Sequence, residues 1–120
     1  MWIYVAADRF RDSELVRAEE VVRLRQEEAG CQVVFADVRG SSREVRVADP
    51  VMTIGEPDLP PNFTLGLAQA LHNAKTSAEK DGESIVVTAR LINGQSWEWV
   101  VHRLDQALES WRTDAVINGR

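Results

Sequence analysis

The side chains with the widest chemical range in this sequence are one thiol and two imidazoles, those of Cys31, His72 and His102. A thiolate and an imidazole can carry out nucleophilic catalysis when a third group orients the imidazole. No local motif surrounds any of the three, and their spacing matches no thiol-enzyme signature. The sequence therefore predicts no catalytic residues. We expect His72 on a helix surface, His102 at a strand end, and Cys31 as a small buried apolar residue.

Acidic side chains offer a second kind of chemistry, because grouped carboxylates bind divalent cations or carry out acid–base catalysis. Several of them fall near the expected ends of the first two strands, yet their spacing matches no cation-binding loop. We expect the earlier ones to cap a helix and the later ones to be solvated, so neither a metal site nor a cofactor is predicted. The residues concerned are Asp8, Asp12, Glu14, Asp37 and Asp49.

Composition predicts a single globular domain over residues 1–120, since 44% of the residues are hydrophobic and 28% are charged. The net charge of −5 argues against non-specific binding to nucleic acid, which depends on neutralising phosphates. No apolar run approaches the roughly 20 residues of a membrane span, and the first residues lack the basic region of a signal peptide. A single cysteine excludes an internal disulfide. We therefore expect a cytoplasmic protein that does not bind membranes.

In the first half of the chain, the pattern predicts a strand, a helix and a two-stranded hairpin. Residues 2–7 are rich in aromatic and β-branched side chains, which is typical of a central strand. Apolar residues then recur at helical spacing over residues 13–29, and Gly30 follows as a stop. Residues 32–38 and 43–48 predict strands joined by a turn. Arg39, Arg43 and Arg46 around that turn could hold an anion, but an ordinary hairpin is the favoured interpretation.

In the second half, an apolar stripe predicts a helix from Asn62 or Phe63 to Asp81, with Gly82 just past its end. An Asn-Gly step between the alternating runs 84–91 and 96–102 predicts a β-hairpin. Residues 104–111 predict a short third helix. The members of the helical stripe are Phe63, Leu67, Ala70, Leu71, Ala74 and Ala78.

The register of the C-terminal hairpin decides which face its two tryptophans occupy. A three-residue loop over residues 92–94, with Gly94 left-handed, pairs Ala89 with Trp97 and Val87 with Trp99. One face of the hairpin is then apolar and would be buried under helices. A two-residue turn would instead expose both tryptophans as an aromatic platform for a partner. Because the three-residue loop keeps the apolar residues together, we expect that register.

The predicted order is β-α-β-β-α-β-β-α. Its first six elements match the split β-α-β arrangement of ferredoxin-like folds. The predicted fold class is therefore α+β: a ferredoxin-like β-α-β-β-α-β core with a C-terminal β-hairpin strand and a short third helix.

Residues 49–61 form a long loop that contains all four prolines of the chain. Loops of this length without regular structure are often functional. We predict that this loop contacts a protein partner, so that the chain is a small, acidic protein-binding module without catalytic activity, such as an inhibitor, an immunity-type protein or an adaptor. The alternative is a ferredoxin-like regulatory domain that forms a homodimer and binds a small ligand. The predicted partner-binding residues are Met52, Ile54, Glu56, Asp58 and Leu59.

Overall fold

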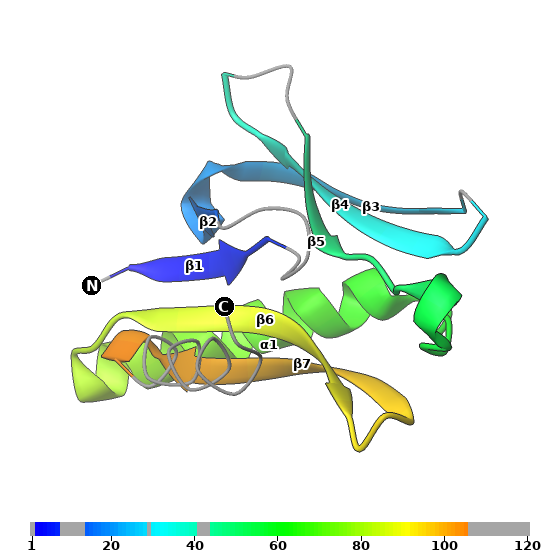
Figure 1. Cartoon of the computed structure of the whole chain (residues 1–120). Coiled ribbons are helices and arrows are strands. Elements are labelled where there is room, and N and C mark those ends of the chain that lie inside the picture. Colours follow the sequence, from blue (N-terminus) through cyan, green and yellow to red (C-terminus); the bar gives the residue numbers. More distant parts are fainter. Residues whose placement is uncertain (1, 8–13, 29, 41–43, 106–120) are drawn as a thin grey trace.

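The computed structural model describes residues 2–7, 14–28, 30–40 and 44–105, and these form two β-sheets and one long helix (Figure 1). The larger sheet has the strand order β2-β1-β6-β7, and the smaller has the order β3-β4-β5. Among the strands of the described residues, only the β1–β6 pair is parallel. The elements are β1 (Ile3–Ala6), β2 (Leu15–Arg17), η1 (Ala18–Glu20), β3 (Val21–Glu28), β4 (Gln32–Val38), β5 (Glu44–Ala48), η2 (Met52–Ile54), α1 (Phe63–Asp81), β6 (Ile85–Ile92) and β7 (Ser96–Arg103).

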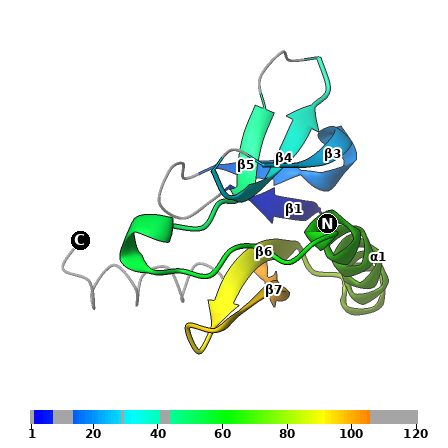
Figure 2. The ribbon, with the colours of Figure 1, turned by 90° about the vertical axis from the view of Figure 1, so that its right-hand side faces the viewer.

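One apolar core joins the two sheets and the helix. It includes Val5 and Val87 from the larger sheet, Val34 and Val45 from the smaller sheet, and Leu67 from α1. Figure 2 shows the smaller sheet above β1, and α1 beside β6 and β7. Each of the three therefore buries an apolar side in this shared core.

The helix predicted from Asn62 or Phe63 to Asp81 is confirmed as α1. Its predicted stripe faces the core, although Leu71 is only partly buried, and His72 is exposed as expected. Gly82 ends the helix in the left-handed region at φ 69°, where its N–H donates to the Ala78 carbonyl at 2.9 Å. Small residues on the stripe let the helix backbone approach the sheet closely.

The helix predicted over residues 13–29 is wrong. Residues 15–28 of that segment form β2, the short η1 turn and β3, and β3 pairs antiparallel with β4. Gly30, expected to stop a helix, has a φ of 83° in the connection between the two strands. A glycine with positive φ serves either structure equally well, so it could not discriminate between them.

Ion pairs between β3 and β4 stabilise the strand that forms in place of the predicted helix. Arg23 and Arg25 lie on the same face of β3 and both donate to the Asp37 carboxylate on β4. On the opposite face, Leu24 packs against the apolar core. This period of two was present in the sequence, but good helix formers surround it, and helix propensity is a weak preference that tertiary pairing overrides.

The C-terminal hairpin confirms the predicted face but not the predicted pairs. Leu91 lies opposite Trp97 and Ala89 opposite Trp99, so the loop is residues 93–95. Asn93 and Gly94 are both left-handed, at φ 55° and 69°, which leaves Ile92 extended and paired with Ser96. The observed partner of each β6 residue lies two positions further along β7 than predicted. A shift of two residues keeps every side chain on the same face of the sheet. The aromatic-platform alternative is therefore wrong, because Trp97 belongs to the core and Trp99 packs against it.

The ferredoxin-like fold class is also wrong. That fold needs two helices packed on one antiparallel sheet, whereas the strands here divide between two sheets and α1 is the single long helix of the described residues. The five predicted strands are present as β1, β4, β5, β6 and β7. Of the predicted third helix, Leu104 and Asp105 are helical, and residues 106–120 lie outside the described part of the chain. The coarser expectation of mixed α and β structure is confirmed.

Candidate protein-binding surface

Residues 49–61, here called the strap, connect β5 to α1 and are fastened to elements of both sheets. The indole N–H of Trp97 on β7 donates to the Pro57 carbonyl at 2.7 Å. The side-chain amide of Gln26 on β3 donates to the Pro60 carbonyl at 3.0 Å. The four prolines also fix their own backbone φ angles. These contacts restrict the position of the strap relative to the core, although its only regular element is a single 3₁₀ turn.

Asp58 is the third fastening point of the strap. Its Oδ1 atom accepts hydrogen bonds from the backbone N–H of Gln32, at 2.7 Å, and of Leu59, at 2.9 Å. The first bond holds the strap to the beginning of β4. Immediately afterwards, Leu59 inserts its side chain into the apolar core.

The outermost part of the strap is the tip, residues 52–55, which begins with the η2 turn. Its base is closed by two hydrogen bonds between Val51 and Glu56: the Val51 N–H donates to Oε1 of Glu56 at 2.8 Å, and the Glu56 N–H donates to the Val51 carbonyl at 3.3 Å. The base is thus fixed, while the side chains of Met52 and Ile54 are 47% and 68% exposed. Figure 2 shows this part of the strap, in green, extending away from both sheets.

The five residues predicted to bind a partner therefore divide into two groups. Met52 and Ile54 are exposed on the tip, and Asp58 is exposed while it also fastens the strap. Glu56 and Leu59 are buried, and they position the tip instead of presenting a surface. Partner binding by the exposed group remains a prediction.

The thiol and the imidazoles lie on separate elements. Cys31 precedes β4 and is only partly buried, which corrects the expectation of a buried residue; its Sγ lies 4.0 Å from Oδ1 of Asp49. His102 lies on β7, where burial, and to a smaller extent the charge of Arg90, lower its pKa. No group of three or more potential metal ligands is present in the described ranges.

The carboxylates considered as a cation site have structural partners where they are described. Asp49 is buried and accepts from Nη1 of Arg46 at 3.0 Å. Asp37 is paired with arginines of β3. Asp8 and Asp12 lie outside the described residues, so their predicted role as helix caps is not tested.

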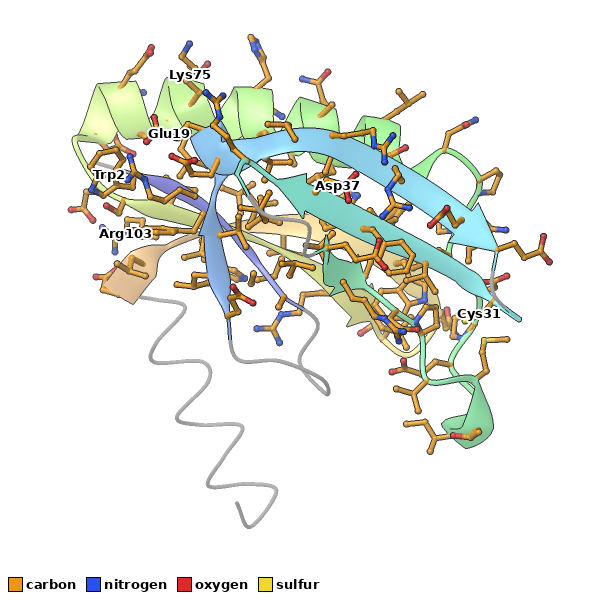
Figure 3. The ribbon with its side chains drawn as sticks, turned by 90° about the horizontal axis from the view of Figure 1, so that it is seen from above. Trp2, Glu19, Cys31, Asp37, Lys75 and Arg103 are labelled. Atoms are coloured by element: carbon orange, nitrogen blue, oxygen red, sulfur yellow. The ribbon has the colours of Figure 1, made fainter. Side chains whose placement is uncertain are left out.

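Sequence reasoning missed the outer face of the smaller sheet. Phe35 points away from the core, yet it is buried, because the guanidinium groups of Arg25 and Arg46 lie 5.1 and 5.8 Å from its ring centre. Arg25 also pairs with Glu44 and Asp37. The signal available in the sequence was the alternation of charged residues in the segments that form β3 and β5: Arg23, Arg25 and Glu27 in the first, and Glu44 and Arg46 in the second. Figure 3 labels Asp37 on this face.

The arginines of β3 lower the pKa of Asp37. The hydrogen bonds from Arg25 have the largest effect, and the hydrogen bond from Arg23 has the next largest. A carboxyl group whose folded pKa is lowered stabilises the fold above its unfolded value of about 3.9, and this stabilisation is lost as the pH falls through the folded pKa.

We therefore expect Asp37→Asn to lower the free energy of unfolding at neutral pH and to reduce its dependence on pH. Urea unfolding at about pH 7 and about pH 3 measures both effects. Glu79→Gln, on the exposed face of α1, is the control and should retain the pH dependence of the parent. If the free energy of unfolding of Asp37→Asn depends on pH as strongly as that of the parent, Asp37 is not the carboxyl group responsible.

No protein-family model, curated protein or solved structure matches this chain at a significant level. In the described part of the chain, no helix is long and apolar enough to cross a membrane.

Proposed function

We propose that this chain is a protein-binding module without catalytic activity, of the inhibitor, immunity-type or adaptor kind, and that the tip is part of its binding surface. We place it in the cytoplasm. The observation that carries the proposal is the contrast within the strap. Its base is buried and hydrogen-bonded, whereas Met52 and Ile54, at its outermost point, are exposed to solvent.

A fixed loop loses little conformational entropy when a partner binds, and this favours association. Full burial of a side chain such as Met or Ile contributes about 1.5–3 kcal/mol. Since Met52 and Ile54 are 47% and 68% exposed, covering what remains of both would supply about 2–3 kcal/mol in total. In protein interfaces, a few side chains that fill pockets of the partner carry most of the binding energy.

Charge adds a preference to this apolar contact. The chain has a net charge of −5, and Asp58 is exposed on the strap behind the tip. Like charges suppress association and opposite charges accelerate it. We therefore propose a partner with an apolar pocket and a basic rim.

The test is the variant Ile54→Ser, which should keep the fold and lose affinity for the partner. The partner is first captured from the native host with the parent chain, then purified and titrated. Loss of one buried side chain of this size, worth about 2 kcal/mol, corresponds to a roughly 30-fold weaker Kd. Met52→Ser should act in the same direction.

Leu65→Ser is a matched control, because Leu65 on α1 is 67% exposed and has the same apolar character as Ile54. It should bind as tightly as the parent. If Ile54→Ser is folded and binds with unchanged affinity, the binding surface lies elsewhere. Leu59→Ser separates the two roles of the strap, since it should lower the free energy of unfolding.

The alternative function, a small-ligand regulatory domain, was based on the ferredoxin-like fold and loses that support with it. The homodimer that belonged to this alternative is supported separately by the edge strand β7.

A further inference from the structure

The two open sheets have four edge strands, and they differ in how well they are protected from pairing with another chain. Edges are commonly blunted by shortness or by β-bulges. β2 has three residues, β3 has an irregular register between Val21 and Arg23, and the β4–β5 pairing shifts beside β5. By contrast, β7 pairs with β6 over eight consecutive residues without a register shift. Among the described strands, β7 is therefore the long and regular edge.

The hydrogen-bond pattern shows which backbone groups of β7 face outward. The Leu104 N–H donates to the Ser84 carbonyl, and the Ile85 N–H donates to the Trp2 carbonyl of the segment entering β1. The backbone groups of even-numbered residues of β6 therefore point toward β7, and those of odd-numbered residues point to the side on which β1 lies. In an antiparallel pair the same alternation applies to the partner strand. The N–H and C=O groups that β7 directs away from β6 are those of Trp97, Trp99, Val101 and Arg103.

We propose that two copies of this chain pair through β7, antiparallel about a twofold axis at Val100, so that their larger sheets form one continuous sheet. This dimer is a property beyond the proposed function and does not involve the tip. A twofold interface must be self-complementary, with each residue pair occurring twice. The sequence of β7 meets that requirement in this register.

On the face toward the core, the register places Trp99 opposite Val101 of the second copy and Trp97 opposite Arg103. Aromatic and β-branched side chains form favourable cross-strand pairs, so the Trp99–Val101 pair stabilises this register. Val101 is 38% exposed although it shares a face with core residues. Pairing at this edge would cover it.

On the outer face, the same register places Glu98 opposite His102 of the second copy, with Val100 opposite itself. Glu98 is exposed and His102 is partly buried at the far end of the strand. Other registers are poorer. A centre at Glu98 places two carboxylates opposite each other, and a centre at Trp99 leaves Glu98 opposite Val100. Of these three registers, only the one centred on Val100 places a hydrogen-bond donor opposite Glu98: the imidazole of His102, whose buried Nε2 has no hydrogen-bond partner among the described residues.

The oligomeric state is measured by sedimentation of the full chain over a concentration series. The parent chain should form a dimer, and Val101→Pro should raise its dissociation constant at least tenfold. Proline at this position removes an outward N–H and leaves the pairing with β6 intact, as edge strands tolerate. A parent chain that stays monomeric at every concentration overturns the proposal, as does a folded Val101→Pro variant that dimerises with unchanged affinity.

Cross-linking tests the register even if the proline variant fails to fold. Residues that meet at a non-hydrogen-bonded pair have Cα atoms about 4.5 Å apart, within the range for a disulfide. In a Cys31→Ser background, Val100→Cys should form a disulfide dimer with oxidised glutathione. Glu98→Cys is the matched control and should not, because its two copies lie several residues apart. The reverse result overturns the register. Neither experiment involves the tip. If no dimer forms through β7, the proposed binding of a partner by the tip is unaffected.

Discussion

Leu67→Ala should lower the free energy of unfolding by about 2–5 kcal/mol, the usual cost of truncating a buried leucine and leaving a cavity. Leu67 lies in the middle of the core-facing stripe of α1 and is fully buried. Leu67 belongs to the apolar cluster that the helix and both sheets share, so a cavity there weakens packing on which all three depend. Urea or guanidinium unfolding, followed by circular dichroism, measures the change.

Leu65→Ala is the matched control for this truncation, since Leu65 lies two positions earlier on the same helix and faces solvent. Its free energy of unfolding should stay within about 0.5 kcal/mol of the parent. Equal changes in the two variants would mean that α1 does not bury the stripe assigned to it. Leu71→Ala should give an intermediate value, because Leu71 is only partly buried.

Trp97→Ala is expected to cost about 3–5 kcal/mol, which is typical of removing a buried aromatic side chain. Trp97 is 7% exposed, packs in the core and donates to the Pro57 carbonyl. The substitution thus removes apolar burial and also unfastens the strap from β7. We expect the tip to lose its fixed position in this variant, so partner affinity should fall as well.

Trp97→Phe separates the hydrogen bond from the packing. It keeps an aromatic ring but leaves the Pro57 carbonyl without its donor, for a cost of about 1–3 kcal/mol. Trp2→Ala is the control of the same residue type, because Trp2 is largely exposed and stacks on Arg17 at the sheet margin. If it destabilises the chain as much as Trp97→Ala does, the core assignment of the hairpin face is wrong.

Several elements were determined by the sequence alone, because local and global preferences agree there. The stripe of α1 has a helical period, and Gly82 directly after it marks the end of the helix. β4 has the predicted bounds of residues 32–38, because this run is rich in the β-branched residue valine. In the hairpin, alternation and the Asn-Gly step both require a turn, and only an odd-length loop keeps the apolar residues on one face.

Only the tertiary structure decided the rest. Residues 21–28 have the composition of a helix, and they form β3 because pairing with β4 satisfies their arginines with Asp37 and Glu44. The sequence of the proline-rich strap gave no sign of which apolar side chains are buried. In the structure, Leu59 belongs to the core and Ile54 to the surface. Their neighbours in space come from distant parts of the chain, such as Trp97. Periodicity reports which residues share a face, whereas burial in a loop depends on contacts that no local pattern encodes.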